Sequence, residues 1–409
     1  MGINGVIYSP KDMDRNMAVK ELLSIVNTKM LDDVAASTDV NFQVKKLSGQ
    51  VIFKLLLLSI LDDTKVSLRV MEELFNTKRF KVFAKTDIDE STRFNSISDR
   101  LSHIDASFFA TIFEQTFLLC QSQLGKKAPD QLQLRLFDST VISASAKLLK
   151  HGMINGLANK SGNHTIRQIK FTLGLQDGLP QKILFFNKQQ QLGEDITLRE
   201  VLMESSFEPN EVAVFDRGLK KRNTFQELKN KDILFVTRIN PSKNIDVIKE
   251  IPVPSNAQTK SLVIVSDQLV YLYYGKNMKL KEPFRLVKAT SLQSNESLWF
   301  LTNIEENIPA VTITDIYKQR WDVEVFFKFI KQHLHLKHFL SYTENGIKVM
   351  MYMSMIAAIL LLTYKKKNEI KGYKIAKYRF VEELDLEIVR EIVLACGGDP
   401  DKSTLFSSA

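Results

Sequence analysis

Four polar side chains recur along one segment of the chain at intervals that suit one face of a helix. Arg320, Glu324 and Lys331 follow Tyr317 at offsets of 3, 7 and 14 residues. An α-helix turns by about 100° per residue, so these four side chains fall within an arc of roughly 60°. One carboxylate among a phenol and two cations packs poorly in a core. The pattern indicates a metal-binding carboxylate flanked by phosphate contacts, and the alternative is a solvated helix face.

The same predicted helix supplies further candidates and an apolar anchor. Lys328, at about 20° on the helical wheel, and Trp321, at about 40°, extend the polar face with one more cation and a large aromatic ring. Val325, Phe329 and Ile330 lie elsewhere on the wheel, where they can hold the helix against a core.

A metal-assisted phosphodiester site needs partner carboxylates, and two acids upstream have the right context. Asp138 ends the alternating run 132–137 and Asp216 follows the apolar run 212–215, so each is predicted at the edge of a strand. Ligands bind at such edges in sheets covered by helices, and carboxylate oxygens suit Mg²⁺. Either acid alone is also explained as a turn former or helix cap.

These blocks together resemble the DDE transposases of bacterial insertion sequences, in particular the insertion sequence 4 family. That family carries a Tyr-(2)-Arg-(3)-Glu-(6)-Lys signature, which is complete here as Tyr317, Arg320, Glu324 and Lys331. Its two other blocks stand here as 138–140, Asp-Ser-Thr, and 216–218, Asp-Arg-Gly. The resemblance runs from about residue 131 to 364. It implies that Asp138, Asp216 and Glu324 hold two Mg²⁺ ions, for which Mn²⁺ would substitute, and that the other signature residues grip phosphates.

The activity that the resemblance implies is DNA transposition. A homodimer would bind the terminal inverted repeats on double-stranded DNA, cleave the ends and join them to target DNA by a cut-and-paste route, with a hairpin intermediate in some relatives. Two other classes stay open. A metal-dependent nuclease on the same core would cut without strand transfer, and a non-catalytic derivative would bind DNA ends without cutting them.

Composition agrees with a nucleic-acid partner. The chain has 409 residues, 44% of them apolar, and a formal net charge of +9. Basic residues crowd the predicted site: the segment 140–182 has six Lys or Arg against one acid, and Lys220-Lys221-Arg222 closely follows Asp216. Two cysteines form no framework for disulfides or zinc, which favours a reducing compartment.

No membrane segment or signal peptide is predicted. Two apolar runs, 51–58 and 349–364, read as buried helices, because the first contains Lys54 and the second has only about 16 residues, too few for a bilayer. The amino terminus lacks the apolar core of a signal peptide. We therefore expect a cytoplasmic, nucleoid-associated protein.

The predicted fold is α/β, with a ribonuclease-H-like catalytic core as the resemblance implies. Residues 1–128 read as a helical domain that would bind DNA ends, and 129–239 with 304–364 as the core in the order β-β-β-α-β-α-β. The core would be interrupted by a β-rich insertion at 240–303, and 365–409 would form a helical C-terminal segment. Cations of the N-terminal domain that offer DNA contacts are Arg69, Lys78, Arg79, Lys81 and Arg93.

Three further side chains are weighed for the site. Arg238 closes the last core strand and either faces the site or pairs with a surface acid. The family carries a tryptophan near the end of its insertion that stacks on a flipped base; Trp299 is the candidate, although it lies one position out of place. Core packing is the alternative for Trp299, and Trp321 could share the stacking role.

A histidine pair at the end of the glutamate helix is the remaining motif. His335 and His338 are three residues apart, as zinc ligands on a helix would be, but a further ligand is not evident. DNA binding explains this basic cluster equally well.

Overall fold

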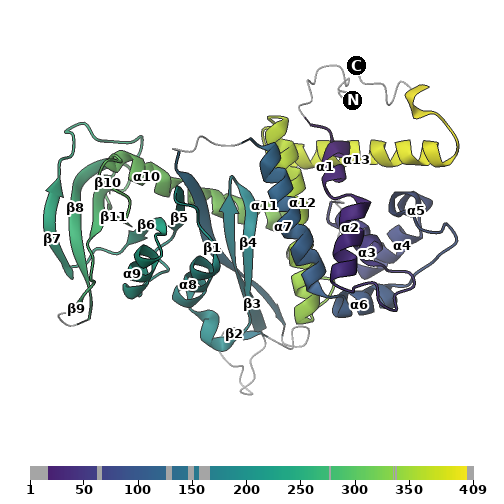
Figure 1. Cartoon of the computed structure of the whole chain (residues 1–409), viewed down its shortest axis with the longest axis horizontal. Helices are drawn as coiled ribbons and strands as arrows, with labels where there is room; N and C mark the ends of the chain where they lie inside the picture. Colours follow the sequence, from purple (N-terminus) through teal and green to yellow (C-terminus); the bar gives the residue numbers. More distant parts are fainter. Residues whose placement is uncertain are drawn as a thin grey trace, which may run out of the picture. The chain divides into compact units, whose positions relative to one another are not determined.

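The computed structural model describes residues 17–61, 67–125, 131–145, 152–155, 166–275, 278–334, 336 and 339–402. It divides the chain into two compact units (Figure 1). The helical unit combines residues 1–125 with 330–409, and the sheet unit is 126–329. His335 and His338 lie outside the described residues.

The helical unit is built from short N-terminal helices packed on two long C-terminal ones. Its N-terminal helices are α1 (Val19–Ile25), α2 (Thr28–Ser37), α3 (Gly49–Leu61), α4 (Leu68–Asn76), α5 (Lys78–Ala84), α6 (Phe94–His103) and α7 (Ala106–Gln123). The long helices are α12 (Glu344–Lys367) and α13 (Tyr373–Ala395), and α12 packs on α3, α6 and α7. The helical structure predicted for residues 1–128 is therefore confirmed for the described part of that range.

Helix α12 is the apolar centre of this unit. By length and composition it could cross a membrane, but 89% of its apolar window is buried inside the protein. Side chains of α3 are buried along nearly its whole length as well. Both segments are the buried helices that the sequence predicts.

The sheet unit contains one mixed sheet. Its strands are β1 (Gln133–Ser145), β2 (Met153–Asn155), β3 (Ile166–Gln176), β4 (Leu179–Phe186), β5 (Glu211–Phe215), β6 (Leu234–Ile239), β7 (Ile245–Ile251), β8 (Leu262–Gly275), β9 (Met278–Lys279), β10 (Phe284–Ser291) and β11 (Ser297–Thr302). The helices α8 (Glu194–Glu204) and α9 (Asn223–Asn230) connect β4 to β5 and β5 to β6. Across the sheet the core strands run β4-β3-β1-β5-β6. Apart from the additional short strand β2, the chain order β-β-β-α-β-α-β matches the prediction.

Strand pairing in the core divides into an antiparallel and a parallel half. β1, β3 and β4 pair antiparallel, and the turn between β3 and β4 places Asp177 at φ 52° and Gly178 at φ 67°, as a tight hairpin requires. β1, β5 and β6 pair in parallel through the crossover helices. The acids lie in this parallel half.

The strand that carries Asp138 is longer than predicted. The sequence suggests that Asp138 stands near the carboxyl end of its strand, but β1 continues to Ser145 because β3 pairs with it along its whole length. On the other side, however, β5 stops at Phe215, opposite Phe137. Asp138 is therefore the first residue of β1 without a partner on the β5 side.

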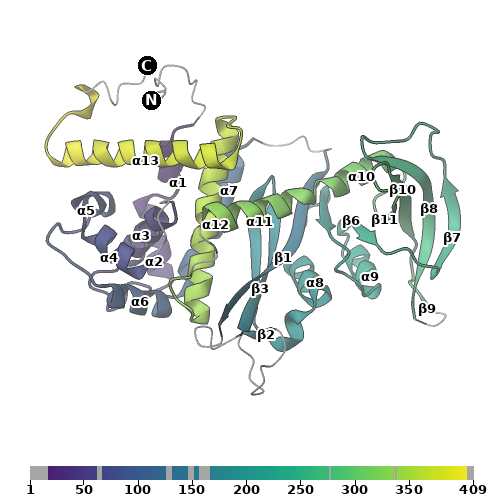
Figure 2. The same cartoon turned by 180° about the vertical axis from the view of Figure 1, so that it is seen from behind.

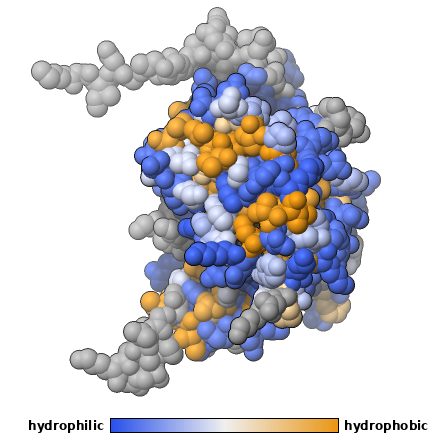
Figure 3. Space-filling view, turned by 90° about the vertical axis from the view of Figure 1, so that its left-hand side faces the viewer, coloured by the Kyte–Doolittle hydropathy of each residue, from blue (hydrophilic) through white to orange (hydrophobic). Residues whose placement is uncertain are grey.

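The predicted insertion extends the core sheet. β11 pairs with β6, so β10, β8 and β7 follow on the same sheet edge. β8 is the longest of these strands and pairs with both β7 and β10. Figure 3 views this side, where apolar patches lie among polar atoms; exposed apolar residues of β7 and β8 include Val247, Ile248 and Val265.

Helices cover the two faces of the sheet. α8 and α9 pack on one face over an apolar core that includes Phe215, Phe225 and Phe235. The opposite face holds α10 (Ala310–Lys318) and the part of α11 (Trp321–His333) that belongs to the sheet unit (Figure 2). There the Phe327 ring lies 6.1 Å from that of Phe171 on β3.

The predicted single helix over 317–331 is wrong at its start. α10 ends at Lys318 and α11 begins at Trp321, and between them the N–H of Arg320 bonds to the carbonyl of Tyr317 at 3.0 Å. This three-residue spacing is a 3₁₀-type turn, tighter than the α-helix. Tyr317 therefore belongs to one helix and Glu324 to the next.

The compact units do not follow the predicted domains throughout. The sequence assigns 304–364 to the core, whereas residues from 330 onward cluster with the N-terminal helices, because the buried α12 packs on α7 and α3. The boundaries of the functional domains stay a prediction.

Candidate active site

Two carboxylates meet where the parallel pairing ends. Phe137 of β1 is paired with Phe215 of β5, so the next residues, Asp138 and Asp216, start level on strands about 4.8 Å apart. Phe215 is likewise paired with Thr237 of β6, which puts Arg238 in the same row. Residues in register share a face of the sheet. The sequence alone predicted both acids at strand edges, and the register adds Arg238.

Tyr317 holds one of these acids from the helical layer. Its hydroxyl donates to Asp216 Oδ1 at 3.0 Å, and that oxygen also accepts the N–H of Arg217 at 2.8 Å. The Tyr317 ring packs edge-on against Phe300, with centroids 5.3 Å apart. Burial, then the charge of Asp216, raises the pKa of the phenol. Tyr317 therefore stays protonated and remains a donor.

Arg320 joins the other two acids. Its Nη2 donates to Glu324 Oε1 at 2.6 Å, and its Nη1 lies 3.8 Å from Asp138 Oδ2. Burial alone would lower the pKa of Arg320, but the bond to Glu324 and neighbouring negative charges raise it overall. One guanidinium thus lies between two carboxylates that come from distant parts of the chain, and its single charge is shared between them.

The carboxylates form a suitable but open donor set for a divalent cation. Among the described residues, no hydrogen bond reaches Asp216 Oδ2, Asp138 Oδ2 or Glu324 Oε2, and three such oxygens suit Mg²⁺. No group of three metal-ligating side chains is preassembled in the described part of the chain. Carboxylates brought close together repel one another until a cation binds between them.

Burial has a large effect on the Asp138 carboxyl. Burial raises its pKa to about 6; the Ser139 N–H and Arg320 lower it, and the charges of Glu194 and Glu324 raise it. The carboxyl is therefore partly protonated near neutral pH. The main cause is burial, however, and not repulsion between carboxylates.

Two arginines leave donors unused in the row of acids. The Nε atoms of Arg320 and Arg238 are buried and have no hydrogen-bond partner. Arg238 also approaches Glu296 at 3.4 Å, so both alternatives for this residue hold. Unsatisfied guanidinium N–H groups suit phosphate oxygens.

The structure does not bring Trp299 to this site. Trp299 is paired with Ile239 and Lys288, and Phe300, its neighbour, with Arg238. Since neighbouring residues of a strand face opposite sides, Trp299 points away from the acids. It packs against the α8–α9 core, under the Lys288 ammonium at 4.5 Å from its ring centroid. Core packing is thus the better explanation.

The remaining candidates lie further along α11 or at its start. Trp321 is 60% exposed, and Lys328 is exposed one helical turn beyond Glu324. Lys331 lies in the last turn of α11, seven residues after Glu324, and beyond the boundary of the sheet unit. Their roles stay predictions.

Two cations that the sequence analysis named as basic residues for DNA binding instead contact other parts of the protein. Lys81 is 1% exposed: its ammonium donates to the Glu90 carbonyl and lies 3.9 Å from the Phe75 ring centroid. Arg222 donates to the carbonyls of Asn244 and Tyr273. Lys81 is therefore wrong as a DNA contact, and Arg222 is already satisfied.

Sequence reasoning missed three charged residues beside the acids. Lys170 of β3 is buried; burial lowers its pKa, while the charges of Glu194 and Asp138 raise it. Glu194 and Asp195 begin α8, and the Asp195 carboxylate contacts the loop after Asp216. Acids in a first helical turn read as ordinary helix starts, so only the fold distinguishes them.

The chain is similar to several known proteins. Residues 130–360, more than half of the chain and including all three acids, match the family model described as "Transposase DDE domain". A Sinorhizobium fredii protein named as a transposase is 25% identical over 264 residues, which cover 63% of this chain and 69% of that protein. A Synechocystis protein named as a transposase for insertion sequence element IS4SA is 26% identical over 330 residues, covering 79% of this chain and 84% of the other.

One solved structure is similar over most of the chain. It is the piggyBac transposase synaptic complex with hairpin DNA, with a TM-score of 0.47 and 12% identity, covering 93% of this chain and 82% of that one. We draw no conclusion from a likeness at that TM-score.

Proposed function

The chain belongs to the DDE transposase family, and from this premise we propose that it binds the terminal inverted repeats of an insertion sequence, cleaves the ends and joins them to target DNA. One observation carries the proposal. The Phe137–Phe215 register brings Asp138 and Asp216 into one row; Arg320 links Asp138 to Glu324, and Tyr317 bonds to Asp216. These contacts support a shared site for three acids remote in sequence, within a core that we propose is ribonuclease-H-like.

Asp138, Asp216 and Glu324 would hold two Mg²⁺ ions, and Mn²⁺ should substitute, because both prefer oxygen ligands. Bound there, the ions would activate a water or 3′ hydroxyl and stabilise the leaving oxygen. Asp138 would release its proton as metal binds, since a ligand carboxylate must be ionised.

The other residues would hold the DNA strand. Arg320 and Arg238 each carry an unused Nε–H, which supports contacts to phosphate oxygens near the cut. Arg320 would exchange its present bond to Glu324 for such a contact when the acids are neutralised by metal. Tyr317, kept neutral, would fix the Asp216 carboxylate by its hydrogen bond. Lys331 and Lys328 would add phosphate contacts along α11.

We also propose a homodimer in the complex with DNA. Helix α13 packs on α1, α5 and α12 on one side, yet it exposes a series of apolar side chains. They are Ile375, Tyr378, Leu386, Val389 and Leu394. Exposed apolar residues along a helix suit a second copy of the chain. Light scattering with and without end DNA tests this assembly.

A strand-transfer assay tests the proposed function. Donor fragments with the inverted repeats that flank the gene are mixed with a target plasmid and Mg²⁺; joined products are expected. Cleavage without joining would identify a nuclease instead. End binding without cleavage by the unaltered protein would identify a non-catalytic DNA-binding derivative.

The flanking DNA provides an independent check. Short inverted repeats should bracket the gene, with a duplicated host sequence outside them.

The variant Asp138→Ala tests the role of the acids in the same assay. It should keep end binding and lose both cleavage and joining.

A further inference from the structure

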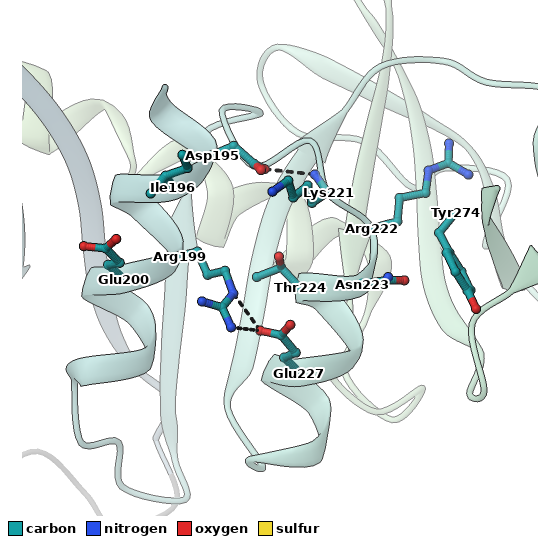
Figure 4. A pocket seen from close by; sticks show the side chains of 10 residues that line it. All are labelled: Asp195, Ile196, Arg199, Glu200, Lys221, Arg222, Asn223, Thr224, Glu227 and Tyr274. Carbon is teal, nitrogen blue, oxygen red and sulfur yellow. Dashed lines mark hydrogen bonds and ion pairs between the residues drawn. The ribbon is translucent and has the colours of Figure 1, made fainter. Parts of the chain in front are cut away.

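A carboxylate outside the three acids holds the loop that follows Asp216. Asp195 Oδ1 accepts the backbone N–H of Lys220 at 2.6 Å and that of Lys221 at 2.9 Å. Figure 4 shows the Asp195 carboxylate directed from α8 toward the segment before α9, beside a cavity of about 480 Å³. Hydrogen bonds from backbone N–H to an ionised carboxylate are stronger than neutral ones.

The other contacts of the loop are made by its side chains: Leu219 packs in the α8–α9 core, and Arg222 donates to the carbonyls of Asn244 and Tyr273. β5 ends at Phe215, so sheet pairing no longer holds the backbone from Asp216 onward. α9 begins at Asn223, and its N-cap residue, Arg222, makes no side-chain capping bond. The contacts from α8 therefore bridge the gap between the end of β5 and the start of α9.

Glu194 supports the same loop by contact. A Cβ placed on Gly218 would lie 2.9 Å from Glu194 Oε2, so this side chain rests directly on the loop backbone. Two consecutive residues of α8 thus face the Asp216 loop, one through hydrogen bonds and one through packing.

We propose that Asp195 is a positioning residue for the reaction, which anchors the loop so that Asp216 meets Asp138 in the same row. The proposal rests on the proposed function. Within the described residues Asp195 makes no ion pair, so its charge serves the two backbone N–H groups. A partner that orients a ligand carboxylate typically changes activity or metal affinity by about 10–100-fold when removed.

Three variants separate positioning from other roles. Asp195→Ala removes the acceptor, whereas Asp195→Asn keeps an oxygen at the same place. Glu200→Ala is the matched control, because Glu200 lines the same cavity from α8 but bonds to Gln191 and not to the loop. Thermal melting establishes that each variant folds.

The first readout does not need activity. Hydrogen exchange of a peptide spanning 216–222 should become on the order of tenfold faster in Asp195→Ala, because the Lys220 and Lys221 amides lose their acceptor. Glu200→Ala should exchange like the unaltered protein, and Asp195→Asn should lie between the two, because its amide oxygen accepts the same bonds without the charge. Unchanged exchange in Asp195→Ala would overturn the anchor.

The second readout is DNA-end cleavage over a Mn²⁺ titration. Asp195→Ala should cleave about 10–100-fold more slowly and need more Mn²⁺ for half-maximal rate, with end binding unchanged, while Asp195→Asn stays within about threefold. Equal loss in both variants, or none in either, would overturn the positioning role. If the unaltered protein does not cleave, the proposed function fails. The hydrogen-exchange experiment still tests whether Asp195 holds the loop.

Discussion

Strand β1 carries two charged sites, three residues apart, that differ in how completely their charges are satisfied. Arg135 is 1% exposed and bonds to Glu211, Gln181 and the Ser206 carbonyl. Glu211 also accepts from Gln176 at 2.6 Å. This network joins β1, β3, β4 and the segment that leads into β5.

The second site, around Asp138, is looser. Its Oδ2 lies 3.8 Å from Arg320, beyond hydrogen-bond range, and Glu324 remains 36% exposed. Burial raises the pKa of Asp138 to about 6, so this acid is costly to ionise in the folded protein. A carboxylate in that condition destabilises the fold unless something further binds it.

The contrast shows what separates a structural ion pair from a functional one. An unused guanidinium N–H does not by itself identify a functional site, because Arg135 in the structural network also has an Nε without a partner. The Arg135 guanidinium lies 4.3 Å from the Phe207 ring centroid. The informative features are carboxylate oxygens without donors, together with a raised acid pKa where the pairing of β1 with β5 ends. Such a site lowers the stability of the fold, and binding of a ligand there would offset that loss.

The largest expected effect comes from removing an acid. Glu324→Gln should slow end cleavage by about 10³-fold or more, which is about 4 kcal/mol of transition-state stabilisation, because a metal ligand is lost. Its melting temperature should be unchanged or higher, since the fold loses an incompletely satisfied charge. Cleavage gels and thermal scans measure both. Normal cleavage by this variant would remove Glu324 from the site.

Breaking the Arg135–Glu211 network should instead destabilise the fold. Arg135→Met leaves Glu211 buried without its cation, and removing one partner of a buried pair costs about 3–5 kcal/mol. Arg320→Met is the matched variant: it should melt close to the unaltered protein but lose cleavage. If Arg320→Met melts as early as Arg135→Met, the two sites do not differ in the way described.

The pH dependence of stability sharpens the comparison. Asp138 holds its proton to a pKa of about 6 in the folded chain, against an ordinary value of 3.8. Between these values the folded state binds more protons than the unfolded state, so stability falls as pH rises and levels off above about 6. The penalty is roughly 1–3 kcal/mol.

Asp138→Asn should remove that slope. In EDTA, its stability relative to the unaltered protein should be lowest near pH 4 and rise to a plateau above about pH 6, as followed by thermal or urea unfolding. A difference that stays constant from pH 4 to pH 8 would contradict the raised pKa.

Much of this arrangement is predictable from local sequence. Asp138 and Asp216 stand beside strand patterns, and the hairpin at Asp177-Gly178 has a local turn signal, so short-range rules place them. The type of each element follows in the same way. What the sequence leaves open is how far a strand extends, because the length of β1 depends on its partner β3.

The rest depends on tertiary contacts. A one-residue step in β11 decides that Phe300 and not Trp299 faces Tyr317, and no local signal sets that register. Asp195 reads as an ordinary helix start until the fold places the loop after Asp216 beside it. The turn at Arg320, which divides the predicted glutamate helix, likewise has no glycine or proline to announce it.

The smallest expected effect concerns the exposed face of α11. Lys328 lies one turn beyond Glu324, and Lys328→Ala should weaken end binding only severalfold, because one phosphate contact contributes a small, salt-dependent part of affinity. The slope of log affinity against log salt should fall in magnitude by about 1. Lys249→Ala is the control, since Lys249 on β7 already pairs with Glu306 at 2.6 Å. If both variants behave alike in a binding titration across salt concentrations, the DNA does not run along α11. The DNA would then approach Asp138, Asp216 and Glu324 from another direction.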